Sequence, residues 1–209
     1  MLQIKDLSYQ YPGHHRQHFP DIEISAGDSL LITGASGKGK STMLFLMSGM
    51  LQPHSGSVLI NNTELSLLTG KVRDRFRGRN IGIVFQTTTF VRSLSVYENI
   101  RFSGWLANSV KPGKNEIYKL LADLDIEECA HKLPDALSVG QRQRASIARG
   151  LIHKPGILLA DEPTASLDDK NADKVANLLL DSVAASGTSL VVVTHDRRLK
   201  KFFNHSMQL

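Results

Sequence analysis

A glycine-rich segment near the N-terminus carries residue types that bind phosphate. It fits the pattern G-x-x-x-x-G-K-[ST] at every fixed position, over Gly34, Ala35, Ser36, Gly37, Lys38, Gly39, Lys40 and Ser41. Glycines at this spacing let consecutive backbone N–H groups point inward around an anion, and a helix N-terminus adds its positive end. We expect Lys40 to reach the β- and γ-phosphates of a nucleotide and Ser41 to place its hydroxyl on Mg²⁺. Thr42 follows directly and completes the predicted phosphate site.

Two adjacent carboxylates follow an apolar run in the second half of the chain. Asp161 and Glu162 come directly after Ile157–Ala160, which predicts a buried strand. Ligands of open α/β sheets bind at the carboxyl ends of strands. Taken alone, the pair is also compatible with a strand that ends in two solvated acids. Beside a phosphate loop, we expect Asp161 to hold Mg²⁺ through water and Glu162 to polarise an attacking water, as in phosphoryl transfer to water.

Short apolar strands alternate with helical segments along the chain. The predicted strands are Leu2–Tyr11, Ser29–Thr33, Val58–Ile60, Ile81–Phe85, Ile157–Ala160 and Ser189–Val193. A helix is expected over Ser41–Met50, and another has an apolar face from Ala172 to Val183 and ends at Gly187. Residues 87–137 have apolar residues at helical spacing, which predicts a helical insert. The alternation predicts an α/β fold with a mainly parallel sheet and helices on both faces.

The composition is typical of one globular unit. The chain has 209 residues, of which 41% are apolar and 22% charged, so we expect neither a disordered tail nor a coiled coil. The single cysteine, Cys129, cannot form an intrachain disulfide and predicts a buried, inert thiol in a reducing compartment. Met1 leads into no signal-peptide pattern. The longest wholly apolar stretches, such as Met43–Met47, are far shorter than the ~18 residues of a membrane span.

One segment supplies most of the excess positive charge. The chain has 25 Lys and Arg against 20 Asp and Glu, a net charge of +5, and Lys71–Arg79 alone holds five basic residues and one acid. Because this segment lies away from the motif loops, we expect a solvated face, with lipid head groups or a membrane partner as the alternative contact. Nucleic acid is not an expected partner. Three histidines near the N-terminus predict a solvated hairpin in preference to a metal site: they are His14, His15 and His18.

A third motif, with two polar residues at strand ends, resembles a known family. Leu137–Arg144 resembles the LSGGQ signature of the ATP-binding cassette (ABC) ATPases. The signature residues proper are Ser138, Val139, Gly140 and Gln141. Gln86 ends the Ile81–Phe85 strand like the family's Q-loop, and His195 follows the Ser189–Val193 strand like its switch histidine. Ser138 can cap the helix that begins near Gly140, whose N-terminus then points at an anion.

Two further segments extend the resemblance over essentially the whole chain. Ser166, Leu167 and Asp168 resemble the D-loop, and Tyr11 is placed like the aromatic residue that stacks on adenine. Tyr9 lies two residues away, so packing of Tyr11 in the core is the alternative. Leu94–Ile100, with the segments around the signature and the carboxylates, is similar to the branch of lipoprotein-releasing and macrolide-export ATPases.

The resemblance implies a P-loop NTPase core with a mainly parallel sheet, an N-terminal antiparallel β subdomain and an inserted helical subdomain. We expect one ABC ATPase domain over 1–209, in which residues 1–86 and 138–209 form the catalytic core with the β subdomain and residues 87–137 form the helical subdomain. The implied cofactors are ATP and Mg²⁺. The implied catalytic residues are Glu162, His195 and Gln86, and the implied metal site consists of Ser41, Gln86 and Asp161.

The resemblance also implies partners. In the family the phosphate loop of one protomer faces the signature of another, so we expect a second cassette, identical or paralogous. We further expect a separate transmembrane permease subunit, which places the chain in the cytoplasm, on the inner face of the cell membrane. A soluble ABC ATPase without a transport role and a nucleotide-binding scaffold with low turnover are the alternatives.

Two residues depart from the family pattern. Val139 replaces the second signature glycine, and we keep the assignment because Ser138 and Gly140 remain to contact phosphate. Lys38 replaces the small residue usual between the last two glycines of the phosphate loop. Its ammonium group either attracts nucleotide or extends into solvent.

Overall fold

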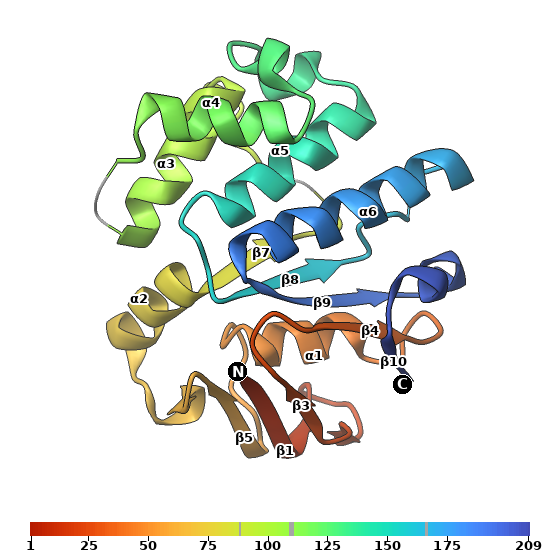
Figure 1. The fold of residues 1–209 in the computed structure, drawn as a ribbon. Helices are drawn as coiled ribbons and strands as arrows, with labels where there is room; N and C mark the ends of the chain where they lie inside the picture. The colour runs from red at the N-terminus through yellow and green to blue at the C-terminus, as the bar shows by residue number, and fades with distance from the viewer. Residues whose placement is uncertain (88, 109–110, 166) are drawn as a thin grey trace.

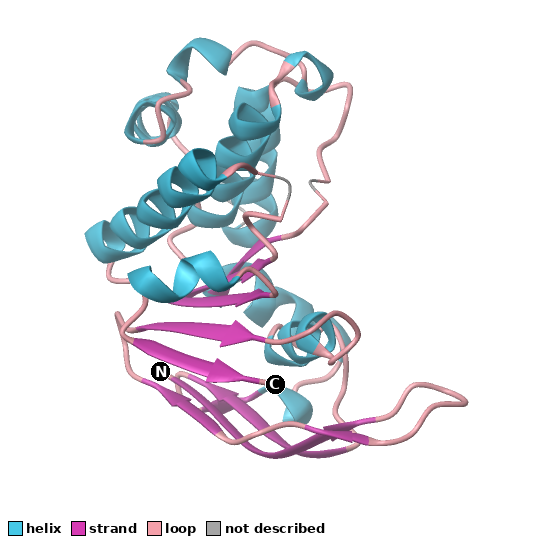
Figure 2. Ribbon diagram, turned by 90° about the vertical axis from the view of Figure 1, so that its right-hand side faces the viewer, coloured by secondary structure: helices cyan, strands magenta, loops and turns pink. Residues whose placement is uncertain are grey.

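The computed structural model describes residues 1–87, 89–108, 111–165 and 167–209, and it contains two sheets (Figures 1 and 2). One sheet is wholly parallel, with strand order β10-β4-β9-β8-β7. Its strands are β4 (Ser29–Thr33), β7 (Ile81–Val84), β8 (Ile157–Asp161), β9 (Ser189–Thr194) and β10 (His205–Gln208). The predicted parallel α/β core is therefore confirmed.

The second sheet is antiparallel and is built from N-terminal strands. They are β1 (Leu2–Tyr9), β2 (Gln17–His18), β3 (Ile22–Ile24), β5 (Ser55–Ile60) and β6 (Thr63–Glu64). The strand β1 pairs with β2, β3 and β5, all antiparallel. This sheet is the expected N-terminal antiparallel unit, and its β1–β2 connection reaches the site described below.

Six α-helices lie in the described part of the chain. They are α1 (Lys40–Met47), α2 (Gly70–Asn80), α3 (Val96–Asn108), α4 (Lys114–Asp123), α5 (Val139–Leu151) and α6 (Asp169–Ser186). Figure 1 shows α1 between the two sheets, α5 and α6 on the other face of the parallel sheet, and α3 and α4 farther out. Short 3-10 helices cover Leu65–Leu67, Glu127–Cys129, Pro134–Ala136 and Arg197–Phe202, the last called η4. None of the described helices has the length and apolar character needed to cross a membrane.

The parallel sheet separates two hydrophobic cores. In β8, Ile157 and Leu159 face the core that includes α1 and the antiparallel sheet, whereas Leu158 and Ala160 face the core that includes α5 and α6. Because both faces of the sheet are covered, β8 and β9 are buried along their whole length and have no polar alternation. Cys129 lies in the second core, in agreement with the expected buried thiol, and burial raises its pKa.

Several predicted element boundaries were wrong by one to three residues. The helix expected over Ser41–Met50 ends at Met47, because Gly49 adopts a left-handed conformation with φ of 67°. The first strand ends at Tyr9, whose pairing with Gln17 closes the hairpin. The strand expected from Val58 begins at Ser55, since backbone pairing with β1 extends over three residues that have no apolar pattern.

The basic segment forms helix α2. None of its side chains is buried, in agreement with the expected solvated face. Asp74 accepts a hydrogen bond from Arg77 Nη2 at 2.8 Å. Such an exposed pair contributes little to stability, about 0–1 kcal/mol.

Gly82 allows β7 to lie directly against α5. A Cβ atom at Gly82 would lie 2.2 Å from the carbonyl oxygen of Gly150, which is a rigid backbone atom. We predict that Gly82→Ala lowers the free energy of unfolding by about 1–3 kcal/mol, because β7 or α5 must shift. Thermal unfolding followed by circular dichroism would then show a midpoint lower by roughly 3–10 °C.

Gly113 provides the matched control for this prediction. A Cβ atom there meets nothing within 4 Å, and its φ of −66° suits any residue. Because Gly113 is the N-cap of α4, where alanine is less favourable than glycine, Gly113→Ala is expected to lower the midpoint, but by less than Gly82→Ala does. Equal midpoints for the two variants would contradict the close packing of β7 on α5.

Candidate functional site

Three adjacent parallel strands bring the predicted motifs to one edge of the sheet. The phosphate loop follows β4, His195 follows β9, and Asp161 with Glu162 ends β8. An open cleft of about 910 Å³ lies at this edge. The predicted residues that line it are Tyr11, Ala35, Ser36, Gly37, Gly39, Lys40, Ser41, Thr42, Gln86, Glu162 and His195. The cleft therefore joins the phosphate loop to the candidate catalytic residues.

The phosphate loop has the conformation that its glycines permit. Gly37 and Gly39 have φ values of 79° and 86°, in the left-handed region. The buried ammonium group of Lys40 donates hydrogen bonds to the carbonyl oxygens of Gly34, at 2.9 Å, and Ala35, at 3.1 Å. It also lies 3.5 Å from Glu162 Oε1. Lys40 therefore already lines the cleft, with backbone carbonyl oxygens as its hydrogen-bond acceptors.

Gln17 is a site residue that the sequence did not reveal. Its side-chain amide donates to the carbonyl oxygen of Lys38 and lies against Gly39, where a Cβ atom would be 2.2 Å from Gln17 Nε2. Gln17 also lines the cleft and pairs with Tyr9 in the sheet. It therefore ties the β1–β2 hairpin to the phosphate loop. No motif contains it, so only the contact in space identifies it.

The residues expected at a metal converge as hard oxygen donors. Ser41 Oγ donates a hydrogen bond to Asp161 Oδ1 at 3.1 Å, and Gln86 lines the same cleft. Burial raises the pKa of Asp161, and the hydrogen bond from Ser41 partly offsets that shift. The described residues contain no group of three His, Cys, Asp or Glu side chains able to hold a metal by themselves. Few protein ligands, all of them oxygen atoms, fit Mg²⁺, which usually keeps waters and phosphate oxygens as its other ligands.

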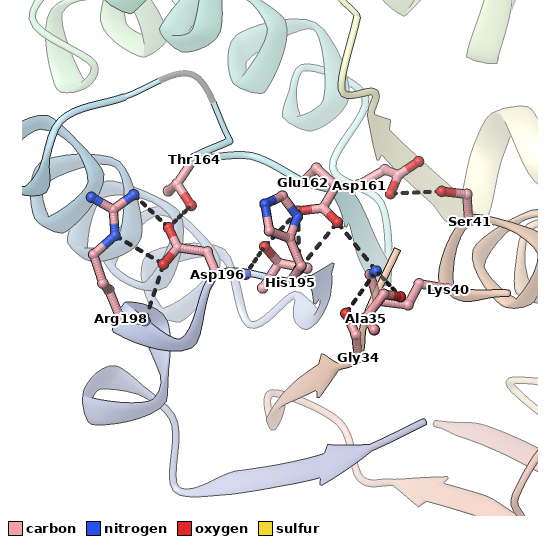
Figure 3. Close-up of polar contacts among 11 residues, drawn as sticks. Gly34, Ala35, Lys40, Ser41, Asp161, Glu162, Thr164, His195, Asp196 and Arg198 are labelled. Carbon is pink, nitrogen blue, oxygen red and sulfur yellow. Dashed lines mark hydrogen bonds and ion pairs between the residues drawn. The ribbon is translucent and has the colours of Figure 1, made fainter. Parts of the chain in front are cut away.

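Glu162 is fixed by several donors at the end of β8. Its backbone has a φ of 47°, which is uncommon for a residue with a side chain. Thr194 Oγ1 donates to Glu162 Oε2 at 2.7 Å, and the backbone N–H of His195 donates to both carboxylate oxygens at 3.1 Å (Figure 3). Burial by itself would raise the pKa of Glu162, but hydrogen bonds from Thr194 and His195 outweigh burial and lower it. The carboxylate is therefore ionised near neutral pH.

The imidazole of His195 stands between Glu162 and solvent. Its Nδ1 lies 2.9 Å from Glu162 Oε2, and 56% of the side chain is exposed. This contact orients the ring, because the carboxylate fixes the proton on Nδ1. Nε2 is then free to accept a hydrogen bond from a group in the cleft.

The β1–β2 hairpin supplies an aromatic wall to the cleft. Tyr11 is 42% exposed, so the alternative of a core-packed Tyr11 is wrong. The Tyr9 ring contacts it edge to face, with centroids 4.7 Å apart, and the Tyr11 hydroxyl lies 3.3 Å from Thr42 Oγ1. His14 and His15 line the same cleft. The hairpin therefore presents an exposed ring next to the phosphate loop, as stacking on a nucleobase requires.

The signature residues lie outside this cleft. Ser138 is the N-cap of α5: its hydroxyl accepts from the backbone of Gln141 at 3.2 Å, and the Gln141 side chain accepts from the backbone of Ser138 at 3.0 Å. Val139 is the first residue of the helix and is 60% exposed. The prediction that Ser138 caps this helix is confirmed, and neither Ser138 nor Gly140 is among the residues that line the cleft of the phosphate loop.

The D-loop residues are described in part. Ser166 lies outside the described residues. Asp168 is the N-cap of α6 and accepts a hydrogen bond from the backbone N–H of Asn171 at 2.9 Å, which lowers its pKa. Leu167 lines a separate hollow of about 200 Å³ together with Val139 and Glu162. The D-loop and the signature thus share one face of the molecule.

Comparison with known proteins identifies the family. Residues 20–165 match the family described as ABC transporter. The chain belongs to this family. It is 37% identical over 190 residues to the lipoprotein-releasing system ATP-binding protein LolD of Xanthomonas campestris pv. campestris (strain 8004), with 90% of this chain and 80% of that protein aligned. LolD of Legionella pneumophila (strain Lens) is 37% identical over 180 residues, or 86% of this chain and 79% of that protein.

Solved structures agree with this membership. The dimeric structure of MJ0796, a bacterial ABC transporter cassette, superposes with a TM-score of 0.90 at 31% identity and covers 100% of this chain and 94% of that one. The structure of cbiO1 from Clostridium perfringens, part of the ABC transporter complex cbiONQ, gives a TM-score of 0.88 at 29% identity, with 99% and 83% coverage. A structure of MJ0796 in a post-hydrolysis state is bound to ADP and Pi. The chain is therefore an ATP-binding cassette with the P-loop NTPase fold, and ATP hydrolysis is the general activity of its family.

Lys38 and Lys40 have different positions in this cassette. Lys40 is buried and points into the cleft, whereas Lys38 is exposed and does not line it. We predict that Lys40→Ala weakens ATP binding at least tenfold, since hydrogen bonds to charged groups contribute about 1.5–3 kcal/mol each. Lys38→Ser is expected to change the affinity by less than about threefold, because an exposed charge is screened. Equilibrium titration with a fluorescent ATP analogue measures both, and equal losses would refute the ranking.

Proposed function

We propose that the chain hydrolyses ATP to ADP and phosphate and that this hydrolysis powers a transmembrane permease subunit. The observation that carries the proposal is the carboxylate of Glu162, which Thr194 and His195 fix in the same cleft as the phosphate loop. A general base must be held within reach of its water and must be deprotonated at the working pH. Glu162 meets both requirements, with Lys40 3.5 Å away on the side of the phosphates.

In the proposed mechanism each cleft residue has one role. Lys40 exchanges its carbonyl acceptors for the β- and γ-phosphate oxygens, and the loop amides bind the remaining charge. Ser41, Asp161 and Gln86 would hold Mg²⁺. When bound, this ion neutralises charge on the β- and γ-phosphates. Tyr11 stacks on the adenine ring.

Glu162 and His195 act on the attacking water. The carboxylate of Glu162 accepts a hydrogen bond from the water and orients it toward the γ-phosphorus atom. Thr194 and the backbone of His195 keep this carboxylate in place. The Nδ1 atom of His195 remains with Glu162, and its Nε2 atom accepts a hydrogen bond from the attacking water. Positioning of this kind provides most of the rate enhancement in phosphoryl transfer.

A second cassette completes the proposed site. Ser138, Val139, Gly140 and Gln141 lie outside the chain's own cleft. The N-terminus of α5 is a helix end of the kind that binds anions, and Ser138 and Val139 are exposed there. We therefore propose that these residues contact ATP held by another cassette, and that ATP closes the two cassettes as a clamp. The dimeric form of MJ0796 supports this proposal.

The proposed permease contact lies next to Gln86. A hollow of about 280 Å³ lies between α2, β7, α3 and α5 and is lined by Phe85, Leu106 and Arg149 among others. We propose that residues 85–95 and this hollow receive a helix of the permease, and that the helical subdomain, residues 87–137, transmits the closure of the core formed by 1–86 and 138–209. The chain then lies on the inner face of the cell membrane. Its relatives named as lipoprotein-releasing system ATP-binding proteins support a transport role.

Glu162→Gln tests both hydrolysis and closure. The amide preserves the shape of the side chain but cannot act as a base, so we predict that ATP turnover falls at least about 100-fold. ATP binding persists, so the variant is expected to elute as a dimer in size-exclusion chromatography with ATP and as a monomer without it. Phosphate release and elution volume are the measurements.

A distant carboxylate provides the control. Glu116→Gln changes a partly exposed residue that pairs with Lys154 at 2.9 Å and does not line the cleft, and is expected to keep wild-type turnover. Retained turnover in Glu162→Gln would contradict the role of Glu162. An ATP-loaded variant that remains a monomer would contradict the clamp.

A further inference from the structure

Arg198 connects the D-loop segment to the residue that follows the switch histidine. It lies in η4, and its guanidinium group binds Asp196 at two points: Nε to Oδ1 at 2.9 Å and Nη2 to Oδ2 at 2.7 Å (Figure 3). The same group donates from Nη2 to the carbonyl oxygen of Leu167 at 3.3 Å and from Nη1 to the carboxylate of Asp169. One side chain therefore holds two segments that are about 30 residues apart in the sequence.

The carboxylate at the centre of these contacts is buried. Asp196 also accepts a hydrogen bond from Thr164 Oγ1 at 2.8 Å. The pKa of Asp196 is lowered to about 2, mainly by the side-chain hydrogen bonds from Arg198. The hydrogen bond from Thr164 lowers it further. A planar, forked guanidinium group satisfies two carboxylate oxygens and a carbonyl oxygen together, which an ammonium group at one point cannot do.

Hydrogen bonds continue from Asp196 to the candidate base. The backbone N–H of Asp196 donates to Thr194 Oγ1 at 3.0 Å, and Thr194 Oγ1 donates to Glu162 Oε2 at 2.7 Å. An unbroken series of contacts thus runs from Leu167 and Asp169 through Arg198 to Glu162. Rigid, fully satisfied polar networks of this kind transmit small displacements.

The segment held by Arg198 lies on the face proposed to meet a second cassette. Leu167 and Val139 line the same hollow, and Asp168 and Asp169 are exposed. A partner that presses on this face therefore meets residues 167–169 directly. Their displacement reaches Asp196 through the guanidinium group.

We propose that Arg198 is a positioning residue for ATP hydrolysis, which couples the D-loop segment 167–169 to the carboxylate of Glu162. This inference rests on the proposed function as an ATP-hydrolysing cassette. Arg198 touches neither nucleotide nor the attacking water. It acts through Asp196 and Thr194, and its loss leaves the phosphate loop intact.

A purely structural role for Arg198 predicts a different outcome. Lys201 lies in the same 3-10 helix and binds Asp173 of α6 at 2.6 Å, without contact to Asp196 or Leu167. If Arg198 merely fastened η4 to α6, loss of either cation would have a similar effect. Lys201→Gln is therefore the matched control.

Steady-state kinetics of the full chain tests the proposal. For Arg198→Gln we expect kcat for ATP hydrolysis to fall about tenfold, with KM for ATP within about twofold of wild type, because only the arrangement of the catalytic groups changes. Arg198→Lys is expected to recover little of kcat, and Lys201→Gln to keep it. A kcat for Arg198→Gln equal to that of wild type, or to that of Lys201→Gln, overturns the proposal.

A double variant separates positioning from simple loss of stability. Arg198→Gln leaves a buried carboxylate without its main partner, so a lower unfolding midpoint is expected. The double variant Arg198→Gln with Asp196→Asn removes both charges and is expected to recover most of the wild-type unfolding midpoint. Its kcat is expected to remain low, because residues 167–169 still lack their contacts with the guanidinium group. Recovery of kcat together with the midpoint overturns the positioning role.

Hydrogen exchange tests the connection without hydrolysis. In the nucleotide-free chain, amides of residues 164–170 are expected to exchange faster in Arg198→Gln than in wild type or Lys201→Gln. Unchanged exchange overturns the inference even if kcat falls. If the wild-type chain does not hydrolyse ATP, the proposed function and the role of Arg198 in hydrolysis are both overturned. If the wild-type chain hydrolyses ATP and Arg198→Gln is equally active, only the role of Arg198 is overturned.

Discussion

The pairing of β4 with β9 and of β9 with β8 is the constraint on which the site depends. In this register Thr33 lies opposite Thr194, and Asp161 lies opposite Val193. The pairing continues beyond the strands, because the backbone N–H of Gly34 donates to Thr194 and that of Glu162 donates to Val193. A phosphate loop, a carboxylate and a histidine from distant parts of the chain are thereby fixed at one edge of the sheet. A shift of one residue in either pairing would move the side chains of a buried strand from one core to the other. Both cores are closely packed, so such a shift is unfavourable.

That constraint makes it possible to keep Glu162 charged and partly strained. A left-handed conformation at a residue with a side chain costs about 1–3 kcal/mol and persists only where its surroundings determine it. Here Thr194 and His195, both from the end of β9, donate to the carboxylate. Their hydrogen bonds more than offset the effect of burial on its pKa. The same donors therefore hold the side chain, keep it ionised and stabilise its unusual backbone, so the candidate base is already organised in the nucleotide-free chain.

The fold class and most of the cleft could be predicted from the sequence, because fixed spacing carries the information. Few positions in a parallel sheet can accommodate the glycine spacing from Gly34 to Ser41. The same is true of the apolar run from Ile157 to Glu162, which ends in two carboxylates. Element ends were less predictable: the end of the first helix depends on the left-handed Gly49. The roles of Gln17 and Arg198 were not predicted, because the contacts that make them connections, to Lys38 and to Leu167, span 21 and 31 residues of sequence and follow no periodic pattern. Side-chain contacts of this kind follow from the tertiary packing, which hydrophobic periodicity does not encode.

The two connections that the sequence did not reveal join opposite ends of the cleft to the rest of the cassette. Gln17 links the aromatic hairpin to the phosphate loop, and Arg198 links residues 167–169 to the loop after β9. Each of them joins a segment of a proposed ligand-binding or partner surface to a segment that carries candidate catalytic residues. The strands fix where the motifs stand, and these two side chains join the loops that follow the strands to other segments. Hydrogen bonds between those loops therefore allow binding at one site to change the arrangement of residues at another. Coupling between two sites requires a structural element whose conformation both sites influence.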